Sequence, residues 1–409
     1  MTIASPLPFL VSIAAYLLVG AAIGRFSRFY YTETHSPENN RFEALDGLRG
    51  LLAFGVYFHH ARFTYQFYSN GCWEAPEGGI YLVLGPLSVA LFFSLTAFLF
   101  WRKALAKGGR VDPVQLFMNR VRRIAPMYYV SLAVAGAVVL VLAKFQFSPF
   151  ATLAPKIGRM LFMGFFGFPE DSIDGTPVNM INAGVFWTLR YEWSYYFSLP
   201  LLAITLRRPK IFVLFVIVFA AASALRPSIQ IARLGPFVLG MCAAQLISWQ
   251  GHSALLRSRF VALIAVLSLL LVPLTMGNYG AESRQSAWKP VTTFCIALPF
   301  IAAVYGNDFF GLLKLRGAKV LGLISYSVYL LHGILLFVVM RIVHLAFPIN
   351  RLSPIMYWVL AFFCGLLTLV LSAVTYRFVE YPWLKYRARR PAPIAAELRS
   401  SMQPPAPVA

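Results

Sequence analysis

The sequence predicts an all-α protein, a polytopic transmembrane bundle of about 11 membrane-spanning helices. Of its 409 residues, 59% are hydrophobic and only 12% are charged, and the mean hydropathy is +0.68. A soluble globular domain has roughly 25% charged residues. Apolar runs near the length needed to cross a bilayer recur along the whole chain. The composition therefore excludes a soluble multidomain enzyme, a disordered chain and a fibrous protein.

Eleven segments are apolar enough to be predicted spans. They are 7–24, 46–67, 80–101, 126–144, 184–206, 210–225, 231–249, 260–277, 290–306, 320–341 and 354–377. The stretch 157–168 is apolar but too short to cross, so we expect it to be re-entrant or interfacial. No CxxC pair is present, and we expect no metal site and no tightly bound cofactor.

The chain carries 36 Lys and Arg against 15 Asp and Glu, a formal net charge of +21. If the N-terminus lies outside the membrane, 24 of the 36 basic residues fall on the cytoplasmic side. This asymmetry follows the positive-inside rule, and an odd number of spans places the C-terminus in the cytoplasm. The surplus charge therefore needs no nucleic-acid partner, and the expected partner is the lipid bilayer.

The second predicted span contains three ionisable residues on one helical face. Asp46, Arg49 and His60 share a stripe, with Arg49 and His60 separated by roughly 16 Å along the axis. Asp46 can pair with Arg49 at the i, i+3 spacing. An ionisable side chain inside a bilayer costs several kcal/mol, so each is a functional candidate. The alternative is an ion pair that pins the helix end and a histidine that only bonds a neighbouring helix.

Three arginines precede the fourth predicted span, at the expected cytoplasmic interface. They are Arg120, Arg122 and Arg123. Guanidinium groups bind phosphates through charge-assisted hydrogen bonds, so the cluster is a candidate phosphate site. The commoner role of such a cluster is topological anchoring or contact with lipid head groups.

Two further spans carry polar side chains. Glu192 lies inside the fifth span, where a carboxylate needs a partner, and Trp187 belongs to an aromatic stripe beside it. Ser325, Tyr329 and His332 share one face of the tenth span, either lining a cavity or joining helices by hydrogen bonds.

The end of the last span carries Glu380, which meets the predicted cytoplasmic side. We expect it to form a structural ion pair with a basic loop.

These segments, in this order, resemble the integral-membrane acyltransferase 3 family. The resemblance covers about 41–386 and rests on five motifs. They are Leu45-Asp46-Gly47-Leu48-Arg49 followed by His60, the R-x-x-R-I-x-P pattern from Arg120 to Pro126, Trp187 to Glu192, Ser325-Tyr326 to His332, and Glu380-Tyr381-Pro382. Each motif alone is weak, but five in order are specific.

The resemblance divides the chain into three parts. Residues 1–40 form an extra N-terminal helix and linker, 41–386 an acyltransferase 3-like membrane domain, and 387–409 a basic, Pro/Ala-rich cytoplasmic tail that we expect to be disordered. Because no soluble hydrolase-like domain follows the membrane part, a separate extracytoplasmic transfer protein is a possible partner.

The resemblance implies a membrane O-acyltransferase of the bacterial inner membrane. It would move an acyl group, commonly acetyl, from cytoplasmic acyl-CoA to a hydroxyl of an extracytoplasmic carbohydrate or a lipid-linked glycan. On this reading His60 is the general base or the acyl carrier, with Arg49 and Glu192 as further catalytic residues.

The remaining candidates bind substrates. Arg120, Arg122 and Arg123 would bind the donor. Residues that line a cavity or bind the acceptor would be Asp46, Trp187, Ser325, Tyr326, Tyr329 and His332.

Two other functions fit the same composition. A secondary transporter or exporter of a glycan or lipid-linked substrate explains the spans and their buried charges, but it does not predict the ordered motifs. A non-catalytic scaffold for polysaccharide assembly predicts that His60 and Glu192 are dispensable.

Overall fold

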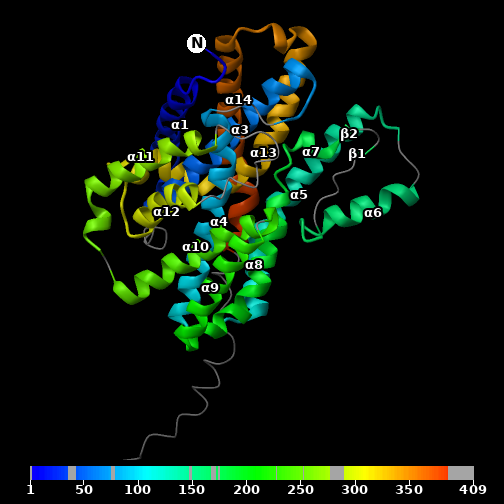
Figure 1. Cartoon of the computed structure of the whole chain (residues 1–409). Coiled ribbons are helices and arrows are strands. Elements are labelled where there is room, and N and C mark those ends of the chain that lie inside the picture. The colour runs from blue at the N-terminus through cyan, green and yellow to red at the C-terminus, as the bar shows by residue number, and fades with distance from the viewer. Residues whose placement is uncertain are drawn as a thin grey trace, which may run out of the picture.

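The computed structural model describes residues 2–35, 43–74, 79–146, 150–166, 172–173, 176–226, 228–251, 253–276 and 290–385. Long helices run up and down through one bundle, and the N-terminus lies at one end of it (Figure 1). Among the described residues, the strands are β1 (Ser172–Ile173) and β2 (Thr176–Pro177), an antiparallel pair in which Ser172 faces Pro177.

The helices of the first half are α1 (Leu7–Phe26), α2 (Arg28–His35), α3 (Glu43–Asn70), α4 (Ile80–Ala106), α5 (Pro113–Leu142), α6 (Phe150–Leu161), α7 (Val178–Ile181) and α8 (Trp187–Ile204). Those of the second half are α9 (Pro209–Leu225), α10 (Ile229–Gln250), α11 (Arg259–Met276), α12 (Pro290–Val304), α13 (Arg316–Ala346), α14 (Pro354–Thr375) and α15 (Tyr381–Lys385). A π-helical turn, Tyr376–Glu380, joins α14 to α15.

The predicted all-α polytopic bundle is confirmed, since each of the eleven predicted spans coincides with a described helix. Six helices of the described chain are long and apolar enough to cross a membrane: α1, α4, α5, α10, α13 and α14 continued to Lys385. Three shorter apolar helices are α9, α11 and α12. The remaining two predicted spans coincide with α3, which carries Asp46, Arg49 and His60, and with α8, which carries Glu192.

Two predictions fall partly or wholly outside the described residues. The predicted interfacial stretch 157–168 overlaps α6, a helix of 12 residues that extends away from the bundle in Figure 1, but 167 and 168 are not described. The predicted disordered tail, 387–409, lies outside the described residues.

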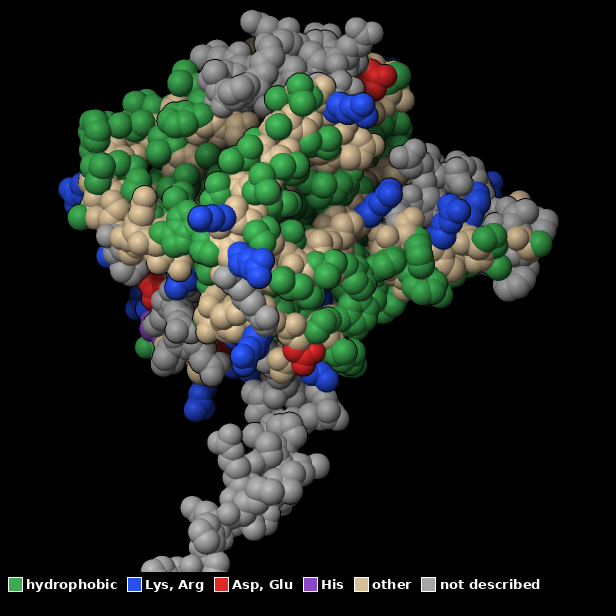
Figure 2. Space-filling view, turned by 60° about the horizontal axis from the view of Figure 1, so that its bottom comes forward, with side chains coloured by type: hydrophobic (Ala, Val, Ile, Leu, Met, Phe, Trp, Pro, Cys, Tyr) green, Lys and Arg blue, Asp and Glu red, His purple; other side chains and the backbone are tan. Residues whose placement is uncertain are grey.

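Hydrophobic side chains cover much of the bundle's outer surface, as Figure 2 shows. Leu18 is 72% exposed, Leu201 70% and Leu345 80%. In water such a surface would be an aggregation hazard, whereas lipid chains solvate it at no cost. The exposed apolar surface therefore fits a protein whose solvent is the bilayer.

Local sequence sets several helix ends. Asp112 precedes Pro113 at the start of α5, and its carboxylate accepts hydrogen bonds from the backbone N–H groups of Val114 and Gln115, at 2.9 and 3.1 Å. Ser353 accepts from the N–H of Met356 at the start of α14. These side chains satisfy helix donors that have no partner within the helix.

Tyrosine hydroxyls join neighbouring helices within the bundle. Tyr16 of α1 donates to the carbonyl of Phe362 in α14 at 2.8 Å, and Tyr57 of α3 donates to the carbonyl of Ala361. Tyr357 of α14 donates in return to the carbonyl of Ala61 in α3. Helices in lipid have no hydrophobic drive to associate, so such bonds and close packing hold them together.

Glycines bring α3 and α13 into close contact. A methyl group at Gly322 would lie 2.1 Å from the carbonyl oxygen of Asp46, and one at Gly50 would lie 2.6 Å from Leu321 Cβ. The two helices run parallel, because ten residues beyond Gly50 and Gly322 lie His60 and His332, which also meet. The glycines therefore set the distance between the helices that carry the candidate site.

Replacing Gly322 by Ala should force α3 and α13 apart, because the new methyl would overlap the Asp46 backbone. We expect a loss of about 1–3 kcal/mol in stability, the usual cost of overpacking. The thermal unfolding midpoint of the purified protein in lipid nanodiscs measures it.

The matched control for this variant is Gly136→Ala in α5, where the added methyl meets nothing within 4 Å. Its midpoint should stay the same or rise slightly, because Ala favours helix over Gly. Equal midpoints for the two variants would show that the close approach of α3 and α13 is not required.

Candidate functional site

A pair of histidines occupies the interface between α3 and α13. Nδ1 of His60 lies 2.9 Å from Nε2 of His332, and the two rings stack with centroids 5.1 Å apart. His332 is fully buried, whereas His60 is half-buried. Nδ1 of His332 lies 3.0 Å from the carbonyl oxygen of Val328, one turn earlier in α13. The pair therefore has an inner member held by its own helix and an outer member that a ligand can approach.

Nearer the start of α3, Asp46 and Arg49 form the ion pair that their spacing predicts. Nη1 of Arg49 lies 2.9 Å from Oδ1 of Asp46, and both side chains are about one-third exposed, at 31% and 30%. Arg49 lies eleven residues before His60, roughly 16 Å along the helix axis. The guanidinium and the imidazole are thus at different depths of the bundle, as the sequence predicts.

Arg123 of α5 forms an ion pair with Glu380 at the end of the last span. Nη1 of Arg123 lies 3.0 Å from Oε2 of Glu380, which is only 1% exposed. The contact is an ion pair without hydrogen-bond alignment, and Ser327 of α13 donates to the other carboxylate oxygen. Glu380 therefore does form an ion pair, and its partner is a helical arginine and not a loop residue as predicted.

Arg120 lies one helical turn before Arg123 and has no carboxylate in ion-pair contact in the described chain. Its guanidinium packs over the ring of Phe100 at 4.6 Å and near that of Tyr196 at 5.7 Å. Its Nε is buried and has no hydrogen-bond partner among the described residues. Arg122, between the two in sequence, is half-buried. Of the three arginines, Arg120 is thus the one that holds a buried, unpartnered donor.

Glu192 faces the arginines. It is half-buried on α8 and accepts a hydrogen bond from the hydroxyl of Tyr196 at 2.8 Å. Arg120, Arg123 and Arg49 are all near enough to interact with its charge. We call Arg49, Arg120, Arg123 and Glu192 the basic cluster. The basic cluster comes from three segments that are far apart in sequence, α3, α5 and α8, and Glu380 lies beside it on a fourth.

Trp187 at the start of α8 lies under an arginine that the sequence did not single out. The guanidinium of Arg233 in α10 lies 4.3 Å from the centre of the Trp187 ring and donates to the Tyr191 hydroxyl at 3.1 Å. Arg233 lies inside the predicted span 231–249, and a basic residue at such a position is a signal that could have found it.

The other candidates on α13 mainly join helices. Tyr326 donates to the carbonyl of Ile124 in α5 at 3.0 Å, and Tyr329 donates to the carbonyl of Val185 at 3.1 Å. Ser325 is buried and bonds the carbonyl of Gly322 in its own helix. Their predicted role in binding an acceptor stays a prediction.

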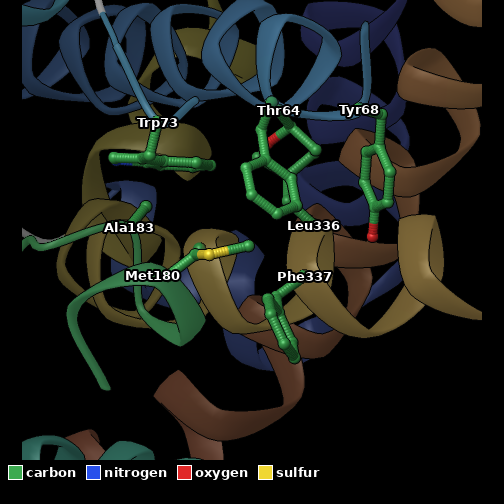
Figure 3. A pocket seen from close by; sticks show the side chains of 9 residues that line it. Thr64, Tyr68, Trp73, Met180, Ala183, Leu336 and Phe337 are labelled. Carbon is green, nitrogen blue, oxygen red and sulfur yellow. The ribbon is translucent and has the colours of Figure 1, made fainter. Parts of the chain in front are cut away.

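A small pocket opens one helical turn beyond the histidine pair (Figure 3). Thr64 follows His60 by four residues on α3, and Leu336 follows His332 by four residues on α13. The remaining lining residues are Phe67, Tyr68, Trp73, Met180, Ala183, Gly333 and Phe337. In Figure 3 the rings of Trp73, Tyr68 and Phe337 surround the opening. The pocket is largely apolar, and it lies on the side of His60 away from the basic cluster.

The fold and the site together define a multi-pass helical membrane protein with an internal polar site. The family described as "Acyltransferase domain", the acyltransferase 3 family, matches residues 42–377. The chain belongs to this family.

A more distant similarity extends over most of the chain. Nodulation protein 10 of Rhizobium leguminosarum bv. viciae is 23% identical over 391 residues, which cover 87% of this chain and 96% of that protein. No solved structure matches the chain.

Replacing Arg123 by Met should destabilise the protein by about 3–5 kcal/mol, because it leaves the Glu380 carboxylate buried without its cation. Adding Glu380→Gln should restore most of the lost stability, since an amide carries no charge and can still accept from Ser327. Thermal unfolding midpoints of the single and double variants measure this.

An exposed ion pair serves as the control for Arg123. Lys314 and Asp308 lie 3.0 Å apart, with 47% and 34% of their side chains exposed, so Lys314→Met should cost at most about 1 kcal/mol. If Arg123→Met cost no more than Lys314→Met, Arg123 would not be required to balance Glu380.

Proposed function

We propose that this protein is a membrane O-acyltransferase of the bacterial inner membrane. It transfers an acyl group, most simply acetyl, from cytoplasmic acyl-CoA to a hydroxyl of an extracytoplasmic carbohydrate. The observation that carries the proposal is the place of His60. It is half-buried and hydrogen-bonded, with a basic cluster on one side along the helix axis and an apolar-walled pocket on the other.

The basic cluster suits an anionic donor. Coenzyme A carries several phosphate charges, and guanidinium groups bind phosphates through charge-assisted, often paired, hydrogen bonds. Arg120 has a buried Nε without a partner and rests on aromatic rings that fix its orientation. Arg123 already pairs with Glu380, so we assign the larger share of donor binding to Arg120. Arg122 contributes positive charge nearby.

His60 is positioned for general-base chemistry. Its imidazole takes the proton of the acceptor hydroxyl as the hydroxyl oxygen forms a bond to the thioester carbonyl carbon. The carbon–sulfur bond then breaks, and the same imidazole returns the proton to the departing thiolate. In a second route the imidazole nitrogen attacks the thioester carbonyl carbon, the carbon–sulfur bond breaks and the thiol leaves. The acceptor hydroxyl oxygen then attacks the acyl-imidazole, the carbon–nitrogen bond breaks, and the imidazole takes the hydroxyl proton. Only the second route leaves an acylated His60 when no acceptor is present.

Arg49 and Glu192 support these steps. Arg49 is one-third exposed, so part of its guanidinium can meet the donor or the negative charge that develops on the thioester oxygen. Glu192 is held by Tyr196 within reach of the three arginines, and it is half-buried. Its carboxylate would separate the cations from one another.

The aromatic side chains beyond His60 suit a carbohydrate. Sugar rings present C–H faces that pack on aromatic rings, and Trp73, Tyr68 and Phe67 line the pocket there. We assign this side to the extracytoplasmic surface, because the basic residues predict that the opposite end faces the cytoplasm. On this assignment the N-terminus lies outside and the C-terminus inside.

Replacing His60 by Gln should abolish acyl transfer. Glutamine can still bond His332, but it has no basic nitrogen, so the rate should fall by about 10²–10⁴-fold. Mass spectrometry of surface polysaccharide from a deletion strain carrying each variant measures acetylation.

His35→Gln is the control, since His35 is an exposed histidine of α2 that bonds only within its own helix. Its acetylation level should match that of the unmodified protein. Full acetylation by the His60→Gln variant, at equal abundance in the membrane, would contradict the assignment of His60.

Replacing Arg120 by Ala should raise the KM for acetyl-CoA by about tenfold or more, because a charged hydrogen bond contributes roughly 1.5–3 kcal/mol. Thioester turnover by the purified protein measures it. Arg226→Ala, at an exposed position after α9, should leave KM unchanged. An unchanged KM in both variants would show that Arg120 does not bind the donor, and its role would then be topological anchoring at the cytoplasmic side.

A further inference from the structure

We propose that His332 is a positioning residue that fixes the tautomer of His60, leaving Nε2 of His60 unprotonated as the basic atom. This inference rests on the proposed function, because it names the atom that accepts the hydroxyl proton. It assigns His332 a role different from acceptor binding.

The first step is the hydrogen bond between His332 and its own helix. Nδ1 of His332 lies 3.0 Å from the carbonyl oxygen of Val328. A carbonyl oxygen can only accept, so Nδ1 of His332 carries the proton. In a neutral imidazole the other nitrogen then has a lone pair and no proton. Nε2 of His332 is therefore an acceptor.

The second step is the hydrogen bond between the two histidines. Nε2 of His332 lies 2.9 Å from Nδ1 of His60, and since Nε2 accepts, Nδ1 of His60 donates. A neutral His60 protonated at Nδ1 has a bare Nε2. The carbonyl of Val328 thus acts on His60 through two hydrogen bonds, and the carbonyl of Val56, one turn earlier in α3, also accepts from the His60 ring.

The surroundings of His332 keep it neutral. It is 0% exposed, and its ring neighbours besides His60 are Tyr57 at 6.5 Å and Tyr329 at 6.1 Å. No carboxylate contacts it in the described part of the chain, so an imidazolium there would be a buried charge without a partner. A charged His332 would reverse the bond and place a proton on Nε2 of His60.

Packing holds the donor and the acceptor in place. A methyl group at Gly333 would lie 2.4 Å from the backbone carbon of Asn182, so α13 fits closely against the segment after α7. Because His332 is completely buried, it cannot touch a substrate and acts only through His60. His60 is the outer ring, which a substrate can reach.

His59 provides an internal comparison. Its Nδ1 lies 2.6 Å from the carbonyl oxygen of Tyr81, so His59 is also protonated at Nδ1. Its ring packs against Gly85 of α4, where an added methyl would lie 2.7 Å from Nε2. The backbone of α4 therefore covers the basic nitrogen of His59, and this residue is a control for the histidine spectra.

Nitrogen NMR of the full-length protein in lipid bilayers, with ¹⁵N-labelled histidine, tests the tautomer directly. The His60 signals are identified by their loss in the His60→Gln variant. We expect His60 to show a protonated Nδ1 and a bare Nε2. A protonated Nε2 in the unmodified protein would overturn the proposal without any assay of activity.

Two variants of matched length then test the role of His332. His332→Gln keeps an oxygen that can accept from Nδ1 of His60, whereas His332→Met keeps the bulk and lacks a strong acceptor. We expect the Met variant to lose the fixed Nδ1–H signal of His60 and to lower kcat with [1-¹⁴C]acetyl-CoA at least tenfold, with an unchanged KM. The Gln variant should keep both the signal and most of kcat.

The spectra and the turnover separate the two proposals. Equal kcat values for the Gln and Met variants, or an unchanged His60 spectrum in the Met variant, would contradict the role of His332. If the spectra were as expected but the unmodified protein turned over no acetyl-CoA with any surface glycan, the proposed function would fail and the orientation of His60 would stand.

Discussion

The close approach of α3 and α13 is the constraint on which the rest of the site depends. Gly50 and Gly322 let the two backbones meet at a distance that any other residue would prevent. Ten residues farther along, the same two helices present His60 and His332 to each other at hydrogen-bonding distance. A parallel pair of helices keeps its register over this length, so packing at the glycines sets the distance between the two histidines. The interior of the bilayer makes this arrangement costly to lose, because freed polar groups would have no water to bond.

The charged residues of the site are also held in place by contacts between helices, because a buried charge needs a partner. Glu380 is nearly inaccessible and stays so because Arg123 and Ser327 approach it from α5 and α13. Arg120, one turn away, stacks on aromatic rings and has no carboxylate in ion-pair contact among the described residues. Arg120 and Arg123, two arginines of one short motif, therefore make different contacts. Arg123 balances a buried carboxylate, whereas Arg120 has a buried Nε that lacks a hydrogen-bond partner among the described residues. Treating the motif as a single phosphate site would miss this division.

Much of the architecture follows from patterns within single segments. Each predicted span coincides with a helix, and the Asp46–Arg49 pair follows from three residues of spacing on one helix. Contacts between distant segments do not follow in this way. The bond between His60 and His332 joins residues 272 positions apart, and no helical periodicity could select that partner over His59 or Glu192. The same holds for Arg233 of α10, which lies over Trp187 of α8.

By itself, the sequence determined that the chain is a helical membrane protein, which residues are buried charges, and to which family it belongs. These properties depend on composition, on helical spacing and on short ordered motifs, all of which are local. The tertiary structure alone decided which of those residues are partners: His332 for His60, Glu380 for Arg123, and Tyr196 for Glu192. The physical reason is that a partner is chosen by the packing of helices against one another. That packing depends on glycines and tyrosines whose effect is visible only when two distant segments meet.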